Sequence, residues 1–321
     1  MSKTLLKYWC EGWEMAEVGL VRFAQVAMEV TKATVPDYRS KFSKRQFTQP
    51  QLLAILCLMR YEDWTFREAE VRLAEHTELR AALELDRVPD YTTLYRFFRR
   101  LPGETIPQAL AQAVGRLPAP PSGGTTVAVD ATGLAPGSIS TFFVKRAKDR
   151  GDGLPWRYWL KWVVAVDVPR RAVLAQVAKP GPTNDSATLR PLVDAARPLS
   201  PIQLVLADAE FDSELNHQHI RKELGAESII PAKRGHRSWS IRGIRAQMRE
   251  HFPQASYGQR ALVESVFSAV KRKLSARAPG RTLLTQSLQA LILGLAYDIY
   301  RLRVCLCHRH THSLLGIPCH T

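Results

Sequence analysis

Two apolar segments of the sequence end in an aspartate, so the fold could place two carboxylates side by side. The segments run from Thr125 to Asp130 and from Gln203 to Asp208, and both have the composition of buried strands. Such strands deliver the residues that follow them to one edge of a sheet, where ligands commonly bind. Two carboxylates there repel each other unless a cation lies between them, and hard oxygen ligands suit Mg²⁺ or Mn²⁺. Two such ions can drive an in-line phosphoryl transfer.

Each of these aspartates also has an ordinary explanation, because an acid at a strand end is a common turn former. Two neighbouring acids, Glu210 and Asp212, compete with Asp208 for the role of ligand. We prefer Asp208 because it directly ends the apolar strand. Asp167 lies in a predicted hairpin and is interpreted as a turn residue.

A third carboxylate comes from a helix predicted over about 259–274. At about 100° per residue, one stripe roughly 60° wide holds four residues whose side chains can act together. They are Tyr257, Arg260, Glu264 and Lys271. The apolar residues of the same segment form a separate stripe that can pack on the sheet, namely Val263, Val266, Phe267 and Val270. Glu264 is the only acid in residues 251–297, so it is well placed to complete a metal site. The alternative is an ordinary amphipathic helix in which Glu264 pairs with Arg260 at i, i+4.

The chain is strongly basic, with a formal net charge of +15 and a pI of about 9.9. Residues 231–303 contain fourteen Lys or Arg and three acids, so most of the excess lies in under a quarter of the chain. Basic side chains favour polyanions because each contact with a phosphate releases condensed counterions. The charge therefore predicts a nucleic-acid partner, and a merely basic soluble enzyme is the alternative.

The first part of the chain, residues 1–117, reads as helical. A buried helix is predicted over 49–60, and Thr65 with Glu68 has the spacing of a capping box. The last strong helix begins near Asp90 and carries several basic residues, an arrangement that suits a helix-turn-helix DNA-binding module. A helical packing or dimerisation domain is the alternative. Residues 118–124 contain three prolines and two glycines, which predicts a linker.

The pattern after the linker changes to alternating strands and helices. We predict a hairpin from 159–168 and 171–177, a short strand at 227–231, and helices at 185–196, 213–224, 259–274 and 284–303. Residues 233–256 read as basic and irregular. This order predicts a catalytic α/β domain over 125–303, built on a mixed sheet covered by helices.

The five cysteines form no disulfide framework, because the number is odd and three lie in the last 17 residues. Cysteines and histidines crowd residues 304–321, but their spacing matches no standard zinc site, so we predict a disordered tail. The first residues lack the apolar run of a signal peptide, and no run reaches the roughly 18 residues of a membrane span. We therefore expect a cytoplasmic protein with no membrane partner.

The spacing of Tyr257, Arg260, Glu264 and Lys271 matches the Tyr-Arg-Glu-Lys motif of DDE transposases from bacterial insertion sequences. Four other segments resemble that family as well: 129–134 around Asp130, 184–186, 207–213 around Asp208, and 230–233. The resemblance extends from about residue 40 to residue 303. A spaced four-residue motif that follows two strand-end aspartates is a specific signal, although each piece alone is weak.

The resemblance implies a ribonuclease H-like fold preceded by an all-helical N-terminal domain. It also implies that Asp130, Asp208 and Glu264 bind Mg²⁺ or Mn²⁺ and carry catalysis. Two reactions are implied: hydrolysis frees a 3′-hydroxyl at each end of the element, and that hydroxyl then attacks target DNA. In relatives with this motif the tyrosine and the basic residues hold DNA near the cut. The expected DNA contacts here are Tyr257, Arg260, Lys271, Lys233, Arg234, Arg272 and Lys273.

Both ends of an element must be held together, so the expected state is a homodimer on double-stranded DNA in the bacterial cytoplasm. Two other functions stay open. One is a DNA-binding protein that keeps the fold without catalysis, against which the intact acids and Lys271 argue. The other is a nuclease that cuts without joining, because hydrolysis and strand transfer use the same site.

Overall fold

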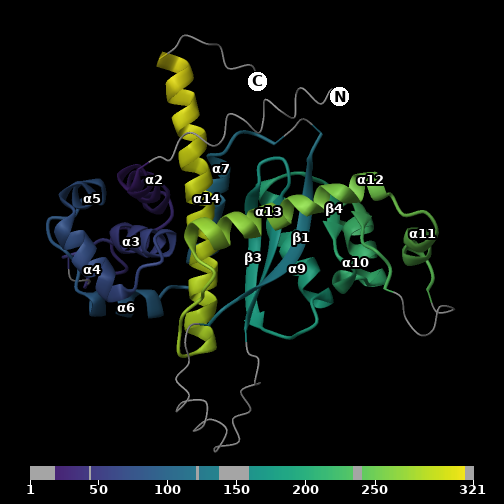
Figure 1. The fold of residues 1–321 in the computed structure, drawn as a ribbon, viewed down its shortest axis with the longest axis horizontal. Coiled ribbons are helices and arrows are strands. Elements are labelled where there is room, and N and C mark those ends of the chain that lie inside the picture. The colour runs from purple at the N-terminus through teal and green to yellow at the C-terminus, as the bar shows by residue number, and fades with distance from the viewer. Residues whose placement is uncertain (1–18, 43–44, 121–122, 137–158, 234–240, 315–321) are drawn as a thin grey trace, which may run out of the picture.

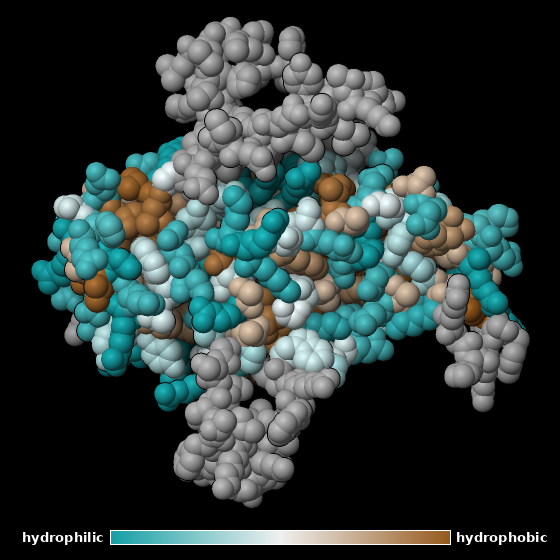
Figure 2. Space-filling view, in the orientation of Figure 1, coloured by the Kyte–Doolittle hydropathy of each residue, from teal (hydrophilic) through white to brown (hydrophobic). Residues whose placement is uncertain are grey.

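The computed structural model describes residues 19–42, 45–120, 123–136, 159–233 and 241–314, with side chains of the last helix described through residue 302. A long helix, α14 (Leu283–Leu314), stands between a group of short helices and a β-sheet (Figure 1). The predicted fold, a mixed sheet flanked by helices and preceded by a helical region, is confirmed. The face seen in Figure 2 is largely hydrophilic, with scattered apolar residues.

The described N-terminal residues form only helices and turns. The helices are α2 (Leu20–Lys32), α3 (Gln49–Tyr61), α4 (Phe66–Glu75), α5 (Thr77–Ala82), α6 (Tyr91–Arg99) and α7 (Thr105–Gly115). The predicted capping box of Thr65 and Glu68 begins α4, and a second box of Thr48 and Gln51 begins α3. Asp90 caps α6 with its carboxylate. These side chains satisfy backbone N–H groups that the first helical turn leaves without partners, and so set where each helix starts.

Five strands form one sheet in the order β3-β2-β1-β4-β5. They are β1 (Thr125–Leu134), β2 (Leu160–Asp167), β3 (Ala172–Pro180), β4 (Ile202–Ala207) and β5 (Glu227–Ile229). The first three are antiparallel neighbours, whereas β4 pairs parallel to β1 and β5 pairs parallel to β4. This is a ribonuclease H-like sheet, and the hairpin of β2 and β3 is where the sequence predicts it.

The end of the first strand differs from the prediction. The sequence predicts that the strand ends at Asp130, but β1 continues to Leu134. The reason is that β2 pairs with β1 along this whole extension, with Asp130 opposite Val164. Only the parallel pairing with β4 stops at Val129, opposite Ala207. Asp130 therefore lies within an antiparallel ladder and at the edge of a parallel one.

Helices cover the sheet and follow it along the chain. They are α9 (Leu189–Ala196), α10 (Glu214–Gln218) with a π-helical turn η4 (His219–Glu223), α11 (Ile244–Glu250), α12 (Gln254–Tyr257), η6 (Gly258–Arg260), α13 (Ala261–Ala269) and a second π-helical turn η7 (Val270–Leu274). The predicted helix over 259–274 thus begins at Gln254 and is not uniform. The 3₁₀ turn η6 and the π turn η7 change its angular spacing, so the stripe calculated for a regular α-helix does not hold along its full length.

The sequence predicts that residues 233–256 are irregular. This prediction is wrong for part of the segment, because α11 forms there. Glu214, on α10, explains this helix: its carboxylate accepts hydrogen bonds from the backbone N–H groups of Ile244 and Arg245, both at 3.3 Å. Arg245 also donates to both carboxylate oxygens of Asp212, at 2.8 and 2.6 Å. A distant acid therefore satisfies the start of α11.

The last helix is also longer than predicted. The sequence predicts its end at residue 303 and disorder beyond, but α14 continues to Leu314. Neither glycine nor proline occurs between Gly294 and Gly316, so nothing in this stretch stops a helix. Residues 315–321 of the predicted tail lie outside the described residues. No described helix is long and apolar enough to cross a membrane.

The helix α14 joins the two sides of the molecule. It packs against β3 and also against α2, α3 and α7, and all of these elements share one hydrophobic core. Gly294 permits the close approach to the sheet, because a Cβ atom there would lie 2.1 Å from the Gln176 side-chain oxygen and 3.0 Å from the Trp162 ring. The Gln176 amide instead donates to the Leu291 carbonyl at 2.8 Å.

Candidate active site

The parallel pairing of β1 and β4 brings two of the predicted ligands together. The ladder ends with Val129 opposite Ala207, so Asp130 and Asp208 are the next residue on each of two neighbouring strands. Asp130 is buried and accepts a hydrogen bond from the Ala131 N–H at 2.8 Å. Asp208 is half-buried and accepts one from the Glu210 N–H at 2.7 Å. Each aspartate therefore uses one oxygen to hold its own backbone in place.

The third acid, Glu264, is connected to this edge by Arg260. Arg260 lies one helical turn before Glu264, and its Nη1 lies 2.7 Å from Asp130 Oδ2 while its Nη2 lies 3.2 Å from Glu264 Oε1. Glu264 is on α13, and its side chain is 62 % exposed. The i, i+4 pairing that an ordinary amphipathic helix would show is therefore present. The same guanidinium, however, also connects Glu264 to the sheet carboxylate.

The electrostatics of Asp130 reflect its burial and the negative charge of two neighbouring acids. The pKa of Asp130 is raised to about 6 from the ordinary 3.8, mainly by burial and also by the nearby Asp208 and Glu264, although the Ala131 N–H and Arg260 act to lower it. Burial lowers the pKa of the Arg260 guanidinium, but Asp130 and the other acids outweigh this effect and hold the pKa above its ordinary value. A single guanidinium thus serves as the counter-charge for a cluster of carboxylates.

The donor chemistry of this cluster fits a hard divalent cation, because three carboxylates on rigid elements are the ligands that Mg²⁺ and Mn²⁺ prefer. Within the described ranges, no three His, Cys, Asp or Glu side chains are already grouped around one point as in a finished metal site. Arg260 binds an oxygen of Asp130 and an oxygen of Glu264. A cation at these acids would compete with that guanidinium.

Tyr257 belongs to the same cluster. Its ring faces the Arg260 guanidinium, with 5.6 Å between the ring centroid and Cζ, and packs edge-on against Phe252 at 4.9 Å. Burial raises the pKa of its hydroxyl, and both aspartates act on it in the same direction. Lys271 lies on η7, where burial lowers the pKa of its ammonium group. Among the described residues, Lys271 forms no hydrogen bond or ion pair with the other three motif residues.

The remaining predicted DNA contacts are dispersed. Lys233 is exposed and its backbone N–H donates to Asp212 at 2.8 Å. Arg272 donates to the carbonyl of Ser268 at 3.4 Å, and the Lys273 ammonium lies 5.9 Å from the ring centroid of Tyr300 on α14. Arg234 lies outside the described residues.

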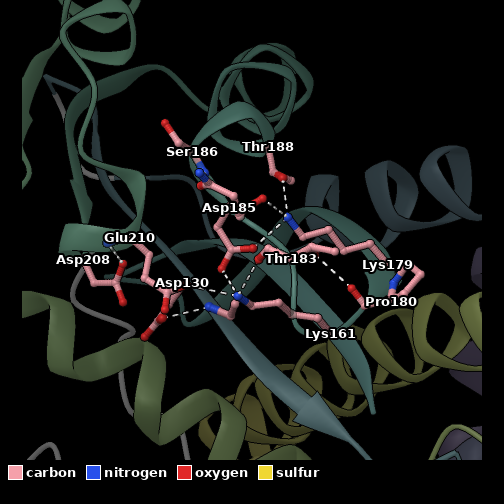
Figure 3. A network of polar contacts seen from close by, with 12 residues as sticks. Asp130, Lys161, Lys179, Pro180, Thr183, Asp185, Ser186, Thr188, Asp208 and Glu210 are labelled. Atoms are coloured by element: carbon pink, nitrogen blue, oxygen red, sulfur yellow. Dashed lines mark hydrogen bonds and ion pairs between the residues drawn. The ribbon is translucent and has the colours of Figure 1, made fainter. Parts of the chain in front are cut away.

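A buried ion cluster beside Asp208 was missed by the sequence analysis (Figure 3). Asp185 is 1 % exposed and forms ion pairs with Lys161 of β2 and with Lys179 of β3, the latter at 2.7 Å. Lys161 also pairs with Glu210 at 3.0 Å, and the backbone of Glu210 is held by Asp208. A single lysine within the apolar sequence of β2 was the available signal, since a buried lysine needs a carboxylate partner.

The two acids that competed with Asp208 have other partners in this structure. Glu210 pairs with Lys161, as described above. Asp212 has a fully buried side chain, and both of its oxygens are bound by Arg245. Asp208 differs from both acids because it forms no ion pair among the described residues and lies at the edge of the sheet beside Asp130.

The pKa of Asp130 predicts an unusual pH dependence of stability. Its folded-state pKa, about 6, lies above the ordinary 3.8, so the folded protein binds this proton more tightly than the unfolded chain. The contribution of Asp130 is therefore most favourable below pH 4 and declines as the pH rises to about 6. In EDTA we expect the stability of wild type relative to Asp130→Asn to fall by roughly 2 kcal/mol between pH 4 and pH 7. Urea unfolding of both proteins measures this difference, and a pH-independent difference would contradict the prediction.

A family model described as a transposase DDE domain matches residues 121–299. The matched segment contains all five strands, the three carboxylates and the helices α11 to α13, whereas the helices α2 to α7 lie before it. A search of curated proteins finds no match.

Proposed function

Because this chain belongs to the family of transposase DDE domains, we propose that it cuts DNA at the ends of a bacterial insertion sequence and joins the freed 3′-hydroxyls to target DNA. The observation that supports this most directly is the approach of three acids from distant parts of the chain. Asp130 and Asp208 follow the last parallel pair of β1 and β4, and Arg260 connects Glu264 to Asp130. A structural role alone does not require that Asp208 and Glu264 both lie near enough to Asp130 to raise its pKa.

We assign Asp130, Asp208 and Glu264 as the ligands of Mg²⁺ or Mn²⁺, in a site for two ions. Bound divalent ions would activate the attacking oxygen and stabilise the leaving oxygen of the phosphodiester. The chain's own part is positioning. The short parallel ladder holds Asp130 and Asp208 at neighbouring strand positions, and α13 places Glu264 across from them.

We assign Tyr257, Arg260 and Lys271 to the DNA strand being cut. Arg260 has a planar guanidinium that suits bidentate phosphate contacts, and Tyr257 covers one face of it. With a cation held by the carboxylates, Arg260 would be free to pair with a phosphate instead. Lys271 forms no ion pair among the described residues, so its charge is available to DNA. Lys233, Arg234, Arg272 and Lys273 add basic charge along the same segments.

The proposed assembly is a homodimer on double-stranded DNA in the bacterial cytoplasm, with one subunit at each element end. Within a subunit, we propose that residues 1–117 bind DNA or the partner, that 118–124 form a linker, and that 125–303 form the catalytic domain. The net charge of +15 supports a DNA partner for the whole chain.

The test uses a labelled duplex that carries the DNA flanking this gene, together with a supercoiled target plasmid. We expect cleavage with Mg²⁺, none with EDTA, and a labelled joined product. A second substrate exposes the 3′-hydroxyl in advance, and its control ends in a dideoxynucleotide that cannot attack. Strand transfer would be supported if the substrate with a free 3′-hydroxyl is joined to the plasmid and the dideoxy control is not. Cleavage without joining would identify a nuclease, and binding without cleavage would identify a non-catalytic DNA-binding protein.

A further inference from the structure

The helix α6 presents a basic face outside the part of the chain that the family model matches. Thr92, Tyr95, Arg96 and Arg99 are spaced at 0, 3, 4 and 7 along it, which places them on one face. Leu94 and Phe98 are buried on the other side, toward α3 and α4. The arginines and Tyr95 are exposed. The helix is thus anchored by its apolar face and leaves its basic face to the solvent.

This basic face is hollow and carries an aromatic side chain. Five residues line a depression of about 490 Å³, namely Thr92, Tyr95, Arg96, Arg99 and Arg100. Tyr95 is 40 % exposed, and its ring is supported edge-on by Phe66 at 5.4 Å. The Arg99 guanidinium lies 5.9 Å from the centroid of the same ring. The tyrosine therefore has a fixed position beside the arginines.

The arginines of this face form no ion pair in the part of the chain that the structure describes. Other exposed basic residues of this protein do form ion pairs, as Arg72 does with Glu75 at 3.7 Å. Within the described ranges, Arg96, Arg99 and Arg100 form no ion pair. Arg96 lies near enough to Asp90 to lower the pKa of that carboxyl. Three guanidinium groups that form no ion pair within one and a half helical turns still make a concentrated positive field, which is suited to a line of phosphates.

We propose that this face of α6 binds the sugar-phosphate backbone of duplex DNA, at a place separate from the cleavage site. The inference rests on the proposed function, because it takes DNA as the partner. Figure 1 shows α6 on the side of α14 opposite to the sheet, so a duplex held there is gripped away from its cut end. Arg96, Arg99 and Arg100 bind phosphates, and Tyr95 packs against the sugar-phosphate chain. The contacts carry affinity and position, and the sequence of the DNA is not read by them.

The test compares DNA affinity for wild type and the variant Arg96→Ala/Arg99→Ala/Arg100→Ala. The matched control is Arg190→Ala/Arg197→Ala/Lys222→Ala, which removes the same charge from exposed positions on α9, η2 and η4. Fluorescence anisotropy in EDTA measures the Kd for an element-end duplex and for an unrelated duplex over a range of salt. A Lys version of the α6 variant keeps the charge and controls for misfolding.

The α6 variant is expected to bind both duplexes about ten- to a hundredfold more weakly near physiological salt, with the slope of log K against log salt reduced by roughly 2.7. The control and the Lys version should stay within a few-fold of wild type. Equal binding by the α6 variant and the control would overturn the inference, as would weakening on the element-end duplex alone, which would indicate base reading.

Cleavage at saturating protein separates this inference from the proposed function. The α6 variant should still cut once it is bound, because its three carboxylates are intact. If wild type cuts and the α6 variant binds normally, the α6 inference fails and the proposed function stands. If wild type binds but does not cut, and the α6 variant loses affinity, the surface stands and the proposed function fails.

Discussion

Replacement of Glu264 by Gln is expected to lower the rate of DNA cleavage on the order of a thousandfold while leaving DNA binding intact. Gln keeps the size and shape of the side chain but removes the negative charge that a divalent ion requires. The Glu264 side chain is 62 % exposed, so the fold does not depend on its burial. The substitution removes one partner of Arg260, which retains Asp130 at 2.7 Å. The loss should therefore appear in the cleavage rate and not in the melting temperature.

The matched control is Glu250→Gln, which removes an exposed acid from the last turn of α11. Single-turnover cleavage of a labelled duplex, at saturating protein and with Mg²⁺, gives the rate for all three proteins. Anisotropy in EDTA gives their affinities. If Glu264→Gln cuts as fast as the control, Glu264 serves only as the i, i+4 partner of Arg260, and its assignment as the third ligand is wrong.

A large loss of stability is expected from Asp185→Asn, about 3 kcal/mol in the free energy of unfolding. The Asp185 carboxylate is buried between Lys161 and Lys179, whose side chains are only 14 % and 18 % exposed. An amide cannot neutralise two ammonium groups, and breaking a buried pair leaves charge without compensation. Lys161 keeps Glu210, an exposed acid at 3.0 Å, which limits the loss.

The pH dependence of this effect follows from the pKa of Asp185. Burial by itself opposes ionisation, but hydrogen bonds from Lys161 and Lys179 hold the pKa below the ordinary 3.8. A lowered folded-state pKa stabilises the protein above pH 4, and this contribution is lost as the pH falls through the folded-state value. The difference between wild type and Asp185→Asn should thus be full at neutral pH and shrink in acid. The stabilising contribution of Asp130 is expected to change with pH in the opposite direction, because its folded-state pKa is raised.

Urea unfolding in EDTA measures the effect, with Asp194→Asn as the control. Asp194 is an exposed acid of the neighbouring helix α9, paired with His219 at 2.8 Å, and an exposed pair contributes less than about 1 kcal/mol. A loss no larger than that of Asp194→Asn would mean that the two lysines find other partners. The buried cluster would then contribute little to holding Lys161 and Glu210 beside Asp208.

The sequence alone was sufficient for features that depend on neighbours along the chain. The capping box at Thr65, the hairpin of β2 and β3, the apolar β4 and the helix around Glu264 all follow from local composition and spacing. The order of these elements predicted the mixed sheet, and the spaced motif, the two aspartates and the resembling segments predicted the family. These inferences hold because side-chain period and capping act over a few residues.

Only the tertiary structure decided which distant groups meet. The extension of β1 depends on pairing with β2, and α11 depends on acids about thirty residues earlier, Asp212 and Glu214. The cluster of Asp185 joins two strands and a loop, and the contact of Arg260 with Asp130 spans 130 positions. Local patterns carry no information on such pairs, because a partner is chosen by the packing of whole elements. The sequence was therefore enough to predict Asp130, Asp208 and Glu264 as the site acids. Only the fold shows that the Arg260 guanidinium lies between Asp130 and Glu264.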